Sequence, residues 1–124
     1  MQAPFVITLE LPKPPSLNEY YSSKHWTSRK KTTDKMRGAI SLLLLEQGQP
    51  PFEVTNHHIS LEVNSRRDID NEILAIKYLN DTMEKDLKWI TADSPKYFNQ
   101  MSIYANKDLP KETWKATIFF YGEG

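Results

Sequence analysis

One short run of the chain constrains the fold more than any other, because it joins a predicted strand to a predicted helix. Before the run, Ile59, Leu61 and Val63 alternate with polar residues, which is typical of a strand with one buried face. After the run, Ile73 and Ile76 begin a helical spacing. The run itself places two arginines before two aspartates and reads Ser65-Arg66-Arg67-Asp68-Ile69-Asp70-Asn71.

The two aspartates of this run predict a metal site. In extended backbone, residues i and i+2 point the same way and lie roughly 6.5 Å apart, so Asp68 and Asp70 can face one pocket. Carboxylate oxygens suit hard divalent cations, and a bound cation relieves the repulsion between two like charges. The alternative is that both residues only cap the following helix. Arg66 and Arg67 favour the metal site, because capping needs no arginines and guanidinium groups suit phosphate.

The bulk properties exclude several other classes of site. With 124 residues the chain is predicted to form one domain. It has no cysteine, which excludes disulfides, thiolate zinc sites and cysteine nucleophiles. The adjacent His57 and His58 would face opposite ways on a strand, so no histidine metal cluster is predicted. The absence of cysteine also fits an intracellular protein. No apolar stretch is long enough for a membrane span, and no N-terminal signal is expected.

The charge is balanced over the whole chain but segregated along it. The formal net charge is zero, which argues against a generic nucleic-acid binder. Residues 11–40, however, hold seven basic residues against two acidic ones, so a local basic surface is predicted.

Apolar periodicity predicts an α+β fold in the order β-α-β-α-β-β, with a mixed sheet and two helices. The strands are expected at 5–11, 57–63, 97–104 and 114–121, the last two as an antiparallel hairpin. The helices are expected from 33–34 to 47–48 and from 70 to 85. Residues Leu42 to Leu45 are apolar around most of the helix, which predicts a second buried contact such as a subunit interface.

Residues 16–33 are polar and predict a long functional loop. Its aromatic and basic side chains suit base stacking and phosphate contacts. The candidates for DNA binding in it are Tyr20, Lys24, Trp26, Arg29, Lys30 and Lys31. The alternative is that Tyr20 and Trp26 pack against the edge of the core while the lysines stay solvated.

Further candidates lie on and after the second predicted helix. Lys77 could stabilise negative charge on a phosphoryl group, or form only an i,i+4 ion pair with Asp81. Either Asp86 or Asp93 could complete a three-carboxylate site. A helix carries Asp86 roughly 24 Å from the aspartate pair, at about 1.5 Å per residue. The next seven residues span up to about 23 Å, which would let Asp93 return. The alternative for Asp93 is a simple turn before Ser94-Pro95.

Three of these features together resemble the RusA family of phage and prophage Holliday-junction resolvases. Residues 14–21 are similar to the family's P-P-S-x-N-x-Y-Y stretch, and 68–71 resemble its D-x-D-N core. A lysine four residues before an aspartate follows, here Lys77 and Asp81, and then an acid beyond a tryptophan, here Asp93 after Trp89. The family lysine usually lies one helical turn closer to the core motif, where this chain has Leu74, and the connection before Asp93 is one residue longer.

The resemblance implies a homodimeric, Mg²⁺-dependent endonuclease that cuts four-way DNA junctions by paired symmetric nicks, with Mn²⁺ as a substitute ion. It implies Asp68, Asp70 and a third acid, Asp93, as metal ligands, with Lys77 assisting catalysis. Arg66 and Arg67 are expected to contact DNA. The expected location is the cytoplasm of a bacterial host, with a phage or prophage origin. The alternative function is a non-catalytic DNA-binding or phage accessory protein that retains the basic segment.

Overall fold

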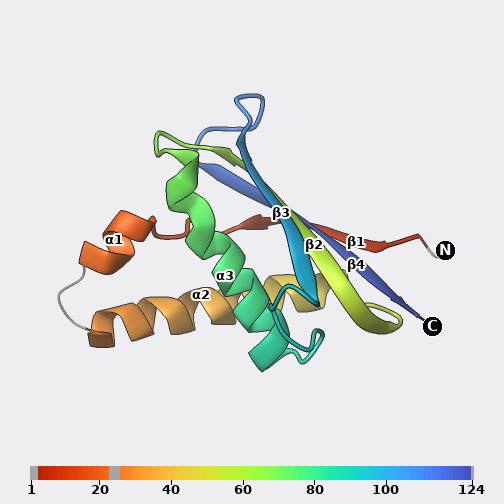
Figure 1. The fold of residues 1–124 in the computed structure, drawn as a ribbon. Helices are drawn as coiled ribbons and strands as arrows, with labels where there is room; N and C mark the ends of the chain where they lie inside the picture. Colours follow the sequence, from red (N-terminus) through yellow and green to blue (C-terminus); the bar gives the residue numbers. More distant parts are fainter. Residues whose placement is uncertain (1–2, 23–25, 124) are drawn as a thin grey trace.

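Alternating apolar residues build one four-stranded sheet in the computed structural model, which describes residues 3–22 and 26–123 (Figure 1). On the first strand Ile7 and Leu9 are buried, whereas Thr8 and Glu10 are exposed. The strands are β1 (Phe5–Leu11), β2 (Glu53–Asn64), β3 (Phe98–Ala105) and β4 (Thr113–Glu123).

The sheet is mixed, with the strand order β1-β4-β2-β3. β4 is antiparallel to both of its neighbours, and β3 is parallel to β2. The expected α+β fold with a mixed sheet is therefore confirmed. A bulge at Thr55 shifts the register, so that Val54 and His57 both face the core.

The predicted hairpin between the last two strands is wrong. β3 and β4 are not neighbours, because β2 lies between them. Their connection, residues 106–112, passes over the end of β2, where Asn106 N–H donates to Val63 O and Glu112 N–H donates to Asn64 O. The short connection suggested a hairpin, but the apolar residues of β4 are buried at a central position between two other strands.

The helices pack on one face of the sheet (Figure 1). On this face the side chains of Ile59, Leu61 and Ile118 are at most 1% exposed. The helical segments are α1 (Leu17–Ser22), α2 (Trp26–Gln47), a 3-10 turn η1 (Ile69–Glu72), α3 (Ile73–Asp81) and a π-helical turn η2 (Thr82–Asp86). The predicted helix at 70–85 is thus present as three consecutive segments.

The predicted long loop at 16–33 is wrong, because α1 and the beginning of α2 occupy most of it. The first turns of α2 are largely exposed, so they carry no apolar stripe for periodicity to detect. A capping signal was present: Ser16 and Glu19 match the S-x-x-E pattern, and Glu19 N–H donates to Ser16 Oγ at 3.1 Å. The end of α2 is as expected, with Gly48 in the left-handed region at φ 92°.

The apolar run on α2 is only partly covered. Leu44 is buried, whereas Leu42 is 66% and Leu45 is 55% exposed. The expected second contact on this face stays a prediction. Among the residues described, no helix has the length and apolar character needed to cross a membrane.

Candidate functional site

The aspartate pair lies, as predicted, where β2 hands over to a helical segment. Asp68 precedes η1 with extended backbone (φ −66°, ψ 141°), and Asp70 lies within the 3-10 turn. Both side chains are exposed. Asp68 occupies the N-cap position, but its side chain makes no capping hydrogen bond. Neither carboxylate has a hydrogen bond or ion pair with any described residue, so the capping alternative is not supported for Asp68.

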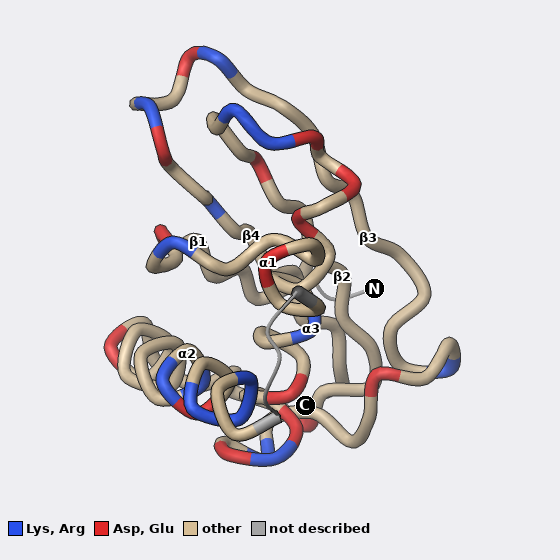
Figure 2. Tube along the Cα trace, turned by 90° about the vertical axis from the view of Figure 1, so that its left-hand side faces the viewer, with Lys and Arg blue, Asp and Glu red and all other residues tan. Residues whose placement is uncertain are grey.

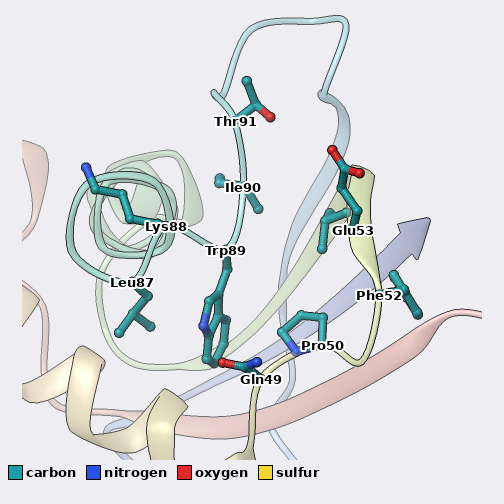
Figure 3. A pocket seen from close by; sticks show the side chains of 10 residues that line it. Gln49, Pro50, Phe52, Glu53, Leu87, Lys88, Trp89, Ile90 and Thr91 are labelled. Carbon is teal, nitrogen blue, oxygen red and sulfur yellow. The ribbon is translucent and has the colours of Figure 1, made fainter. Parts of the chain in front are cut away.

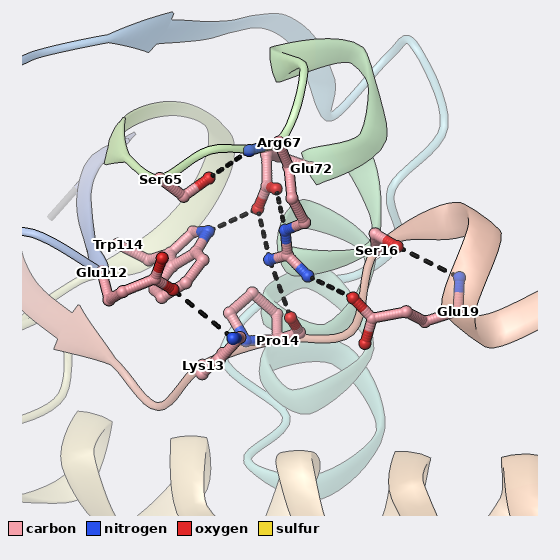
Figure 4. A network of polar contacts seen from close by, with 9 residues as sticks. All are labelled: Lys13, Pro14, Ser16, Glu19, Ser65, Arg67, Glu72, Glu112 and Trp114. Carbon is pink, nitrogen blue, oxygen red and sulfur yellow. Dashed lines mark hydrogen bonds and ion pairs between the residues drawn. The ribbon is translucent and has the colours of Figure 1, made fainter.

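Arg67, directly before the pair, faces inward and is only 17% exposed (Figure 4). Its Nη2 donates to Glu72 Oε2 at 3.0 Å and to Pro14 O at 2.9 Å. Its Nη1 donates to Glu19 Oε1 at 3.1 Å. Its Nε forms an ion pair with Glu72 Oε1 at 2.7 Å, with the N–H too bent for a hydrogen bond. The guanidinium thus ties η1 to α1 and to the chain before it.

Glu72 and Trp114 complete this inward-facing cluster. Glu72 is fully buried, and the indole N–H of Trp114 donates to Glu72 Oε2. The guanidinium carbon of Arg67 lies 5.0 Å from the centroid of the Trp114 ring, a cation–π contact. We call Arg67, Glu72 and Trp114 the Arg67 clamp. It holds the junction between β2 and η1 against β4 and leaves Asp68 and Asp70 on the outside.

The clamp changes the role expected for Arg67. A guanidinium whose donors are already taken by a buried carboxylate and a carbonyl is a poor phosphate ligand. The sequence reading also missed Glu72 and Trp114. Glu72, an acid two residues after Asp70, was the available signal, but nothing local showed that it pointed into the core.

Arg66 points the other way and is exposed. It lines a pocket of 260 Å³ at the end of β2 together with Asn64, Ser65, Lys111 and Glu112. This placement agrees with the expected contact of Arg66 with DNA, which stays a prediction.

Asp93 is not brought to the aspartate pair. β3 starts at Phe98, which pairs with His57. Burial lowers the pKa of His57, and the negative charge of Asp93 raises it by a smaller amount. Asp93 therefore lies near His57. From His57 to Asn64, β2 spans about 23 Å at about 3.3 Å per residue. The connection before β3 does not return along α3, because Ile90 is buried and Trp89 N–H donates to Met83 O at the far end.

Asp86, the rival third acid, also lies at the far end of α3, as the helix length predicted. It accepts two hydrogen bonds of 2.9 Å from Arg37 of α2, and this pairing raises the pKa of Arg37. The pair fastens η2 to α2. Within the described ranges 3–22 and 26–123, no three His, Cys, Asp or Glu side chains are grouped closely enough to hold a metal ion.

Lys77 lies on the exposed side of α3 and forms the i,i+4 ion pair that was its structural alternative. Its Nζ is 4.0 Å from Asp81 Oδ2, and Lys85 approaches the same carboxylate at 3.8 Å. Asn80, three residues after Lys77 on α3, is buried.

The basic and aromatic candidates of residues 16–33 are spread over α1 and α2. Tyr20 packs against the edge of the core, and the guanidinium of Arg29 lies 5.9 Å from its ring centroid. Lys30 pairs with Asp34 at 3.1 Å, and Lys31 is exposed. The predictions for Lys24 and for the side chain of Trp26 fall outside the described part of the chain.

Another pocket, of 330 Å³, lies at the opposite end of β2 (Figure 3). Its walls come from the start of β2 and from the connection after η2. Figure 3 labels Gln49, Pro50, Phe52, Glu53, Leu87, Lys88, Trp89, Ile90 and Thr91 around it. Its position separates it from the aspartate pair by most of the length of β2.

A scan against models of protein families and a search of curated proteins both find no match for this chain. The likeness to the RusA family therefore rests on the motifs in residues 14–21 and 68–71 and on the acids and lysine that follow.

Proposed function

We propose that this chain is a divalent-metal-dependent endonuclease of the RusA type that acts on branched DNA. The observation that carries the proposal is the pair of exposed carboxylates, Asp68 and Asp70, without partners among the described residues. The Arg67 clamp supports the proposal, because it fixes the backbone beneath the pair without using either aspartate carboxylate. Both carboxylates therefore remain available to bind an ion.

The donor set fits Mg²⁺ better than a cation that needs a complete protein cage. Mg²⁺ commonly keeps several waters and binds through one or two carboxylates plus substrate phosphates. Asp68 and Asp70 would hold the ion, and a third acid from the described residues is not required. When bound, such an ion lowers the pKa of a water and neutralises charge on the phosphate. A two-fold homodimer would present two such sites, as paired nicks at a four-way junction require.

The test is cleavage of a four-way junction with Mg²⁺ or with EDTA, by the wild type, Asp70→Asn and Asp93→Asn. Asp70→Asn removes charge but little volume, so it should abolish cleavage while junction binding persists. Asp93→Asn is the matched control, because Asp93 is also exposed but lies at the far end of β2, and it should cut like the wild type. Cleavage by Asp70→Asn at the wild-type rate would refute the assignment.

Metal binding can be measured without activity. Mg²⁺ should raise the thermal midpoint of the wild type, because a ligand that binds only the folded state stabilises it. Asp70→Asn should lose this shift, and in metal-free buffer it should be as stable as the wild type or slightly more so, since like-charge repulsion is relieved. Junction binding by the wild type without Mg²⁺-dependent cleavage would favour the non-catalytic DNA-binding function instead.

A further inference from the structure

We propose that the pocket between Arg66 and Lys111 binds a backbone phosphate of the DNA, next to the phosphate that a metal ion at Asp68 and Asp70 would contact. This inference rests on the proposed function and deepens it by naming the groups that seat the substrate. Arg66 comes from the turn after β2, and Lys111 from the 106–112 connection that follows β3.

Arg66 and Lys111 line the same pocket because hydrogen bonds hold the 106–112 connection against the end of β2. Asn64 anchors it twice: its Nδ2 donates to Leu109 O at 2.6 Å, and its carbonyl accepts from Glu112 N–H at 2.7 Å. Figure 2 shows this connection and the turn after β2 projecting from the same end of the sheet, with basic residues on both. Residues far apart in the sequence thereby line one pocket.

The backbone at the pocket is held in an unusual conformation. Glu112 has a φ of 58°, a left-handed conformation that is uncommon for a residue other than glycine. Such conformations cost free energy and persist where surrounding contacts enforce them, often at ligand sites. Here the hydrogen bond to Asn64 holds the residue directly after Lys111 in place.

The charge of the pocket favours an anion. Lys13 pairs with Glu112 at 3.4 Å, and Glu112 is the only acidic residue that lines the pocket among those the structure describes. Arg66 and Lys111 have no ion pair with any residue in the described ranges. An exposed guanidinium and an ammonium that face one small pocket suit a phosphate, which accepts charge-assisted hydrogen bonds from both.

The pocket is close to the aspartate pair along the chain. Arg66 precedes Asp68 by two residues, so their Cα atoms are at most about 7 Å apart. Successive nucleotides of a strand advance about 3.4 Å along a DNA helix. A phosphate in the pocket would therefore belong to the nucleotides that flank the phosphate at the metal site.

The experiment measures binding of a labelled four-way junction as a function of salt, in the Asp70→Asn background so that nothing is cut. Replacing Arg66 and Lys111 together by alanine should weaken binding and lower the log–log salt slope by roughly one unit per lost phosphate contact. Lys107→Ala is the matched control, because this exposed lysine lies on the same connection but does not line the pocket, and it should change the slope less.

The outcomes separate this inference from the proposed function. If the wild type cuts the junction but the Arg66→Ala/Lys111→Ala protein keeps the slope of its parent, the pocket is not a phosphate site and the inference is overturned. If the slope falls as expected but the wild type never cuts, the pocket stands and the nuclease assignment fails. Absence of any junction binding by the wild type overturns both.

Discussion

Replacing Arg67 with methionine should destabilise the fold far more than the same change at Arg66. Methionine keeps much of the length of the side chain but removes its charge and donors. At position 67 it would leave Glu72 buried without its cation, because no part of the Glu72 side chain is exposed. At position 66 the change removes an exposed cation from solvent. The neighbouring variant is therefore a matched control.

The magnitude follows from the contacts of the clamp. Breaking a buried ion pair by removing one partner costs roughly 3–5 kcal/mol, mainly because the other charge stays buried and uncompensated. The lost cation–π contact with Trp114 is part of the same loss rather than an addition to it. Arg66→Met should change the unfolding free energy by no more than about 0.5 kcal/mol, as for most surface changes.

Urea unfolding followed by tryptophan fluorescence measures the difference. With a slope of about 2 kcal/mol per molar urea, a loss of 3–5 kcal/mol lowers the midpoint by roughly 1.5–2.5 M. Adding Glu72→Gln to Arg67→Met removes the orphaned charge and should restore part of the stability. The double variant therefore shows whether the two side chains are energetically coupled.

Equal small losses for Arg66→Met and Arg67→Met would refute this reasoning. They would mean that the Arg67–Glu72 pair contributes no more than a solvated ion pair. In that case Arg67 would again be a candidate for DNA contact. No recovery in the double variant would instead show that the loss at position 67 has a cause other than the buried charge of Glu72.

Two further predictions test the packing of the fold away from the site. Burial lowers the pKa of His57, so the folded state favours its neutral form, and the unfolding free energy should fall as the pH drops below the ordinary histidine pKa of about 6.5. In urea titrations between pH 7.5 and 5.5, His57→Gln should flatten this pH dependence. Gly122→Ala should destabilise the fold by about 1–3 kcal/mol, measured as a lower thermal midpoint, because a Cβ would lie 2.1 Å from Glu53 O. Gly38→Ala is the control: a Cβ there meets open space on α2, so this variant should stabilise the fold by up to about 1 kcal/mol.

Much of the fold could be predicted from periodicity, because the signal was local. The alternation at Ile59, Leu61 and Val63 indicated β2, and the spacing at Ile73 and Ile76 indicated α3. What periodicity could not predict was strand order. A short connection favours a hairpin, and only the long-range competition for a central position places β4 between β1 and β2.

The exposed first turns of α2 escaped detection for a different reason. Helical periodicity reports burial, and residues 27–31 are largely exposed. Their helix is supported by polar contacts such as the Lys30–Asp34 pair. Asp93 was predicted to approach the aspartate pair because the connection is long enough. The length of a connection sets only an upper limit on distance and does not give a direction. The burial of Ile90, which decides where the connection goes, is a property of the folded core.

The two adjacent arginines show that a motif does not specify the role of each residue in it. Arg66 and Arg67 are chemically identical and directly precede the same aspartates, yet one faces the pocket and the other faces Glu72. Because the inward arginine joins Pro14, Glu72 and Trp114, losing it would shift the backbone that presents Asp68 and Asp70. Loss of cleavage in an Arg67 variant would therefore carry no information about phosphate binding by that side chain. Only a variant at Arg66, with stability and the Mg²⁺-dependent thermal shift preserved, can separate contact with the substrate from support of the metal site.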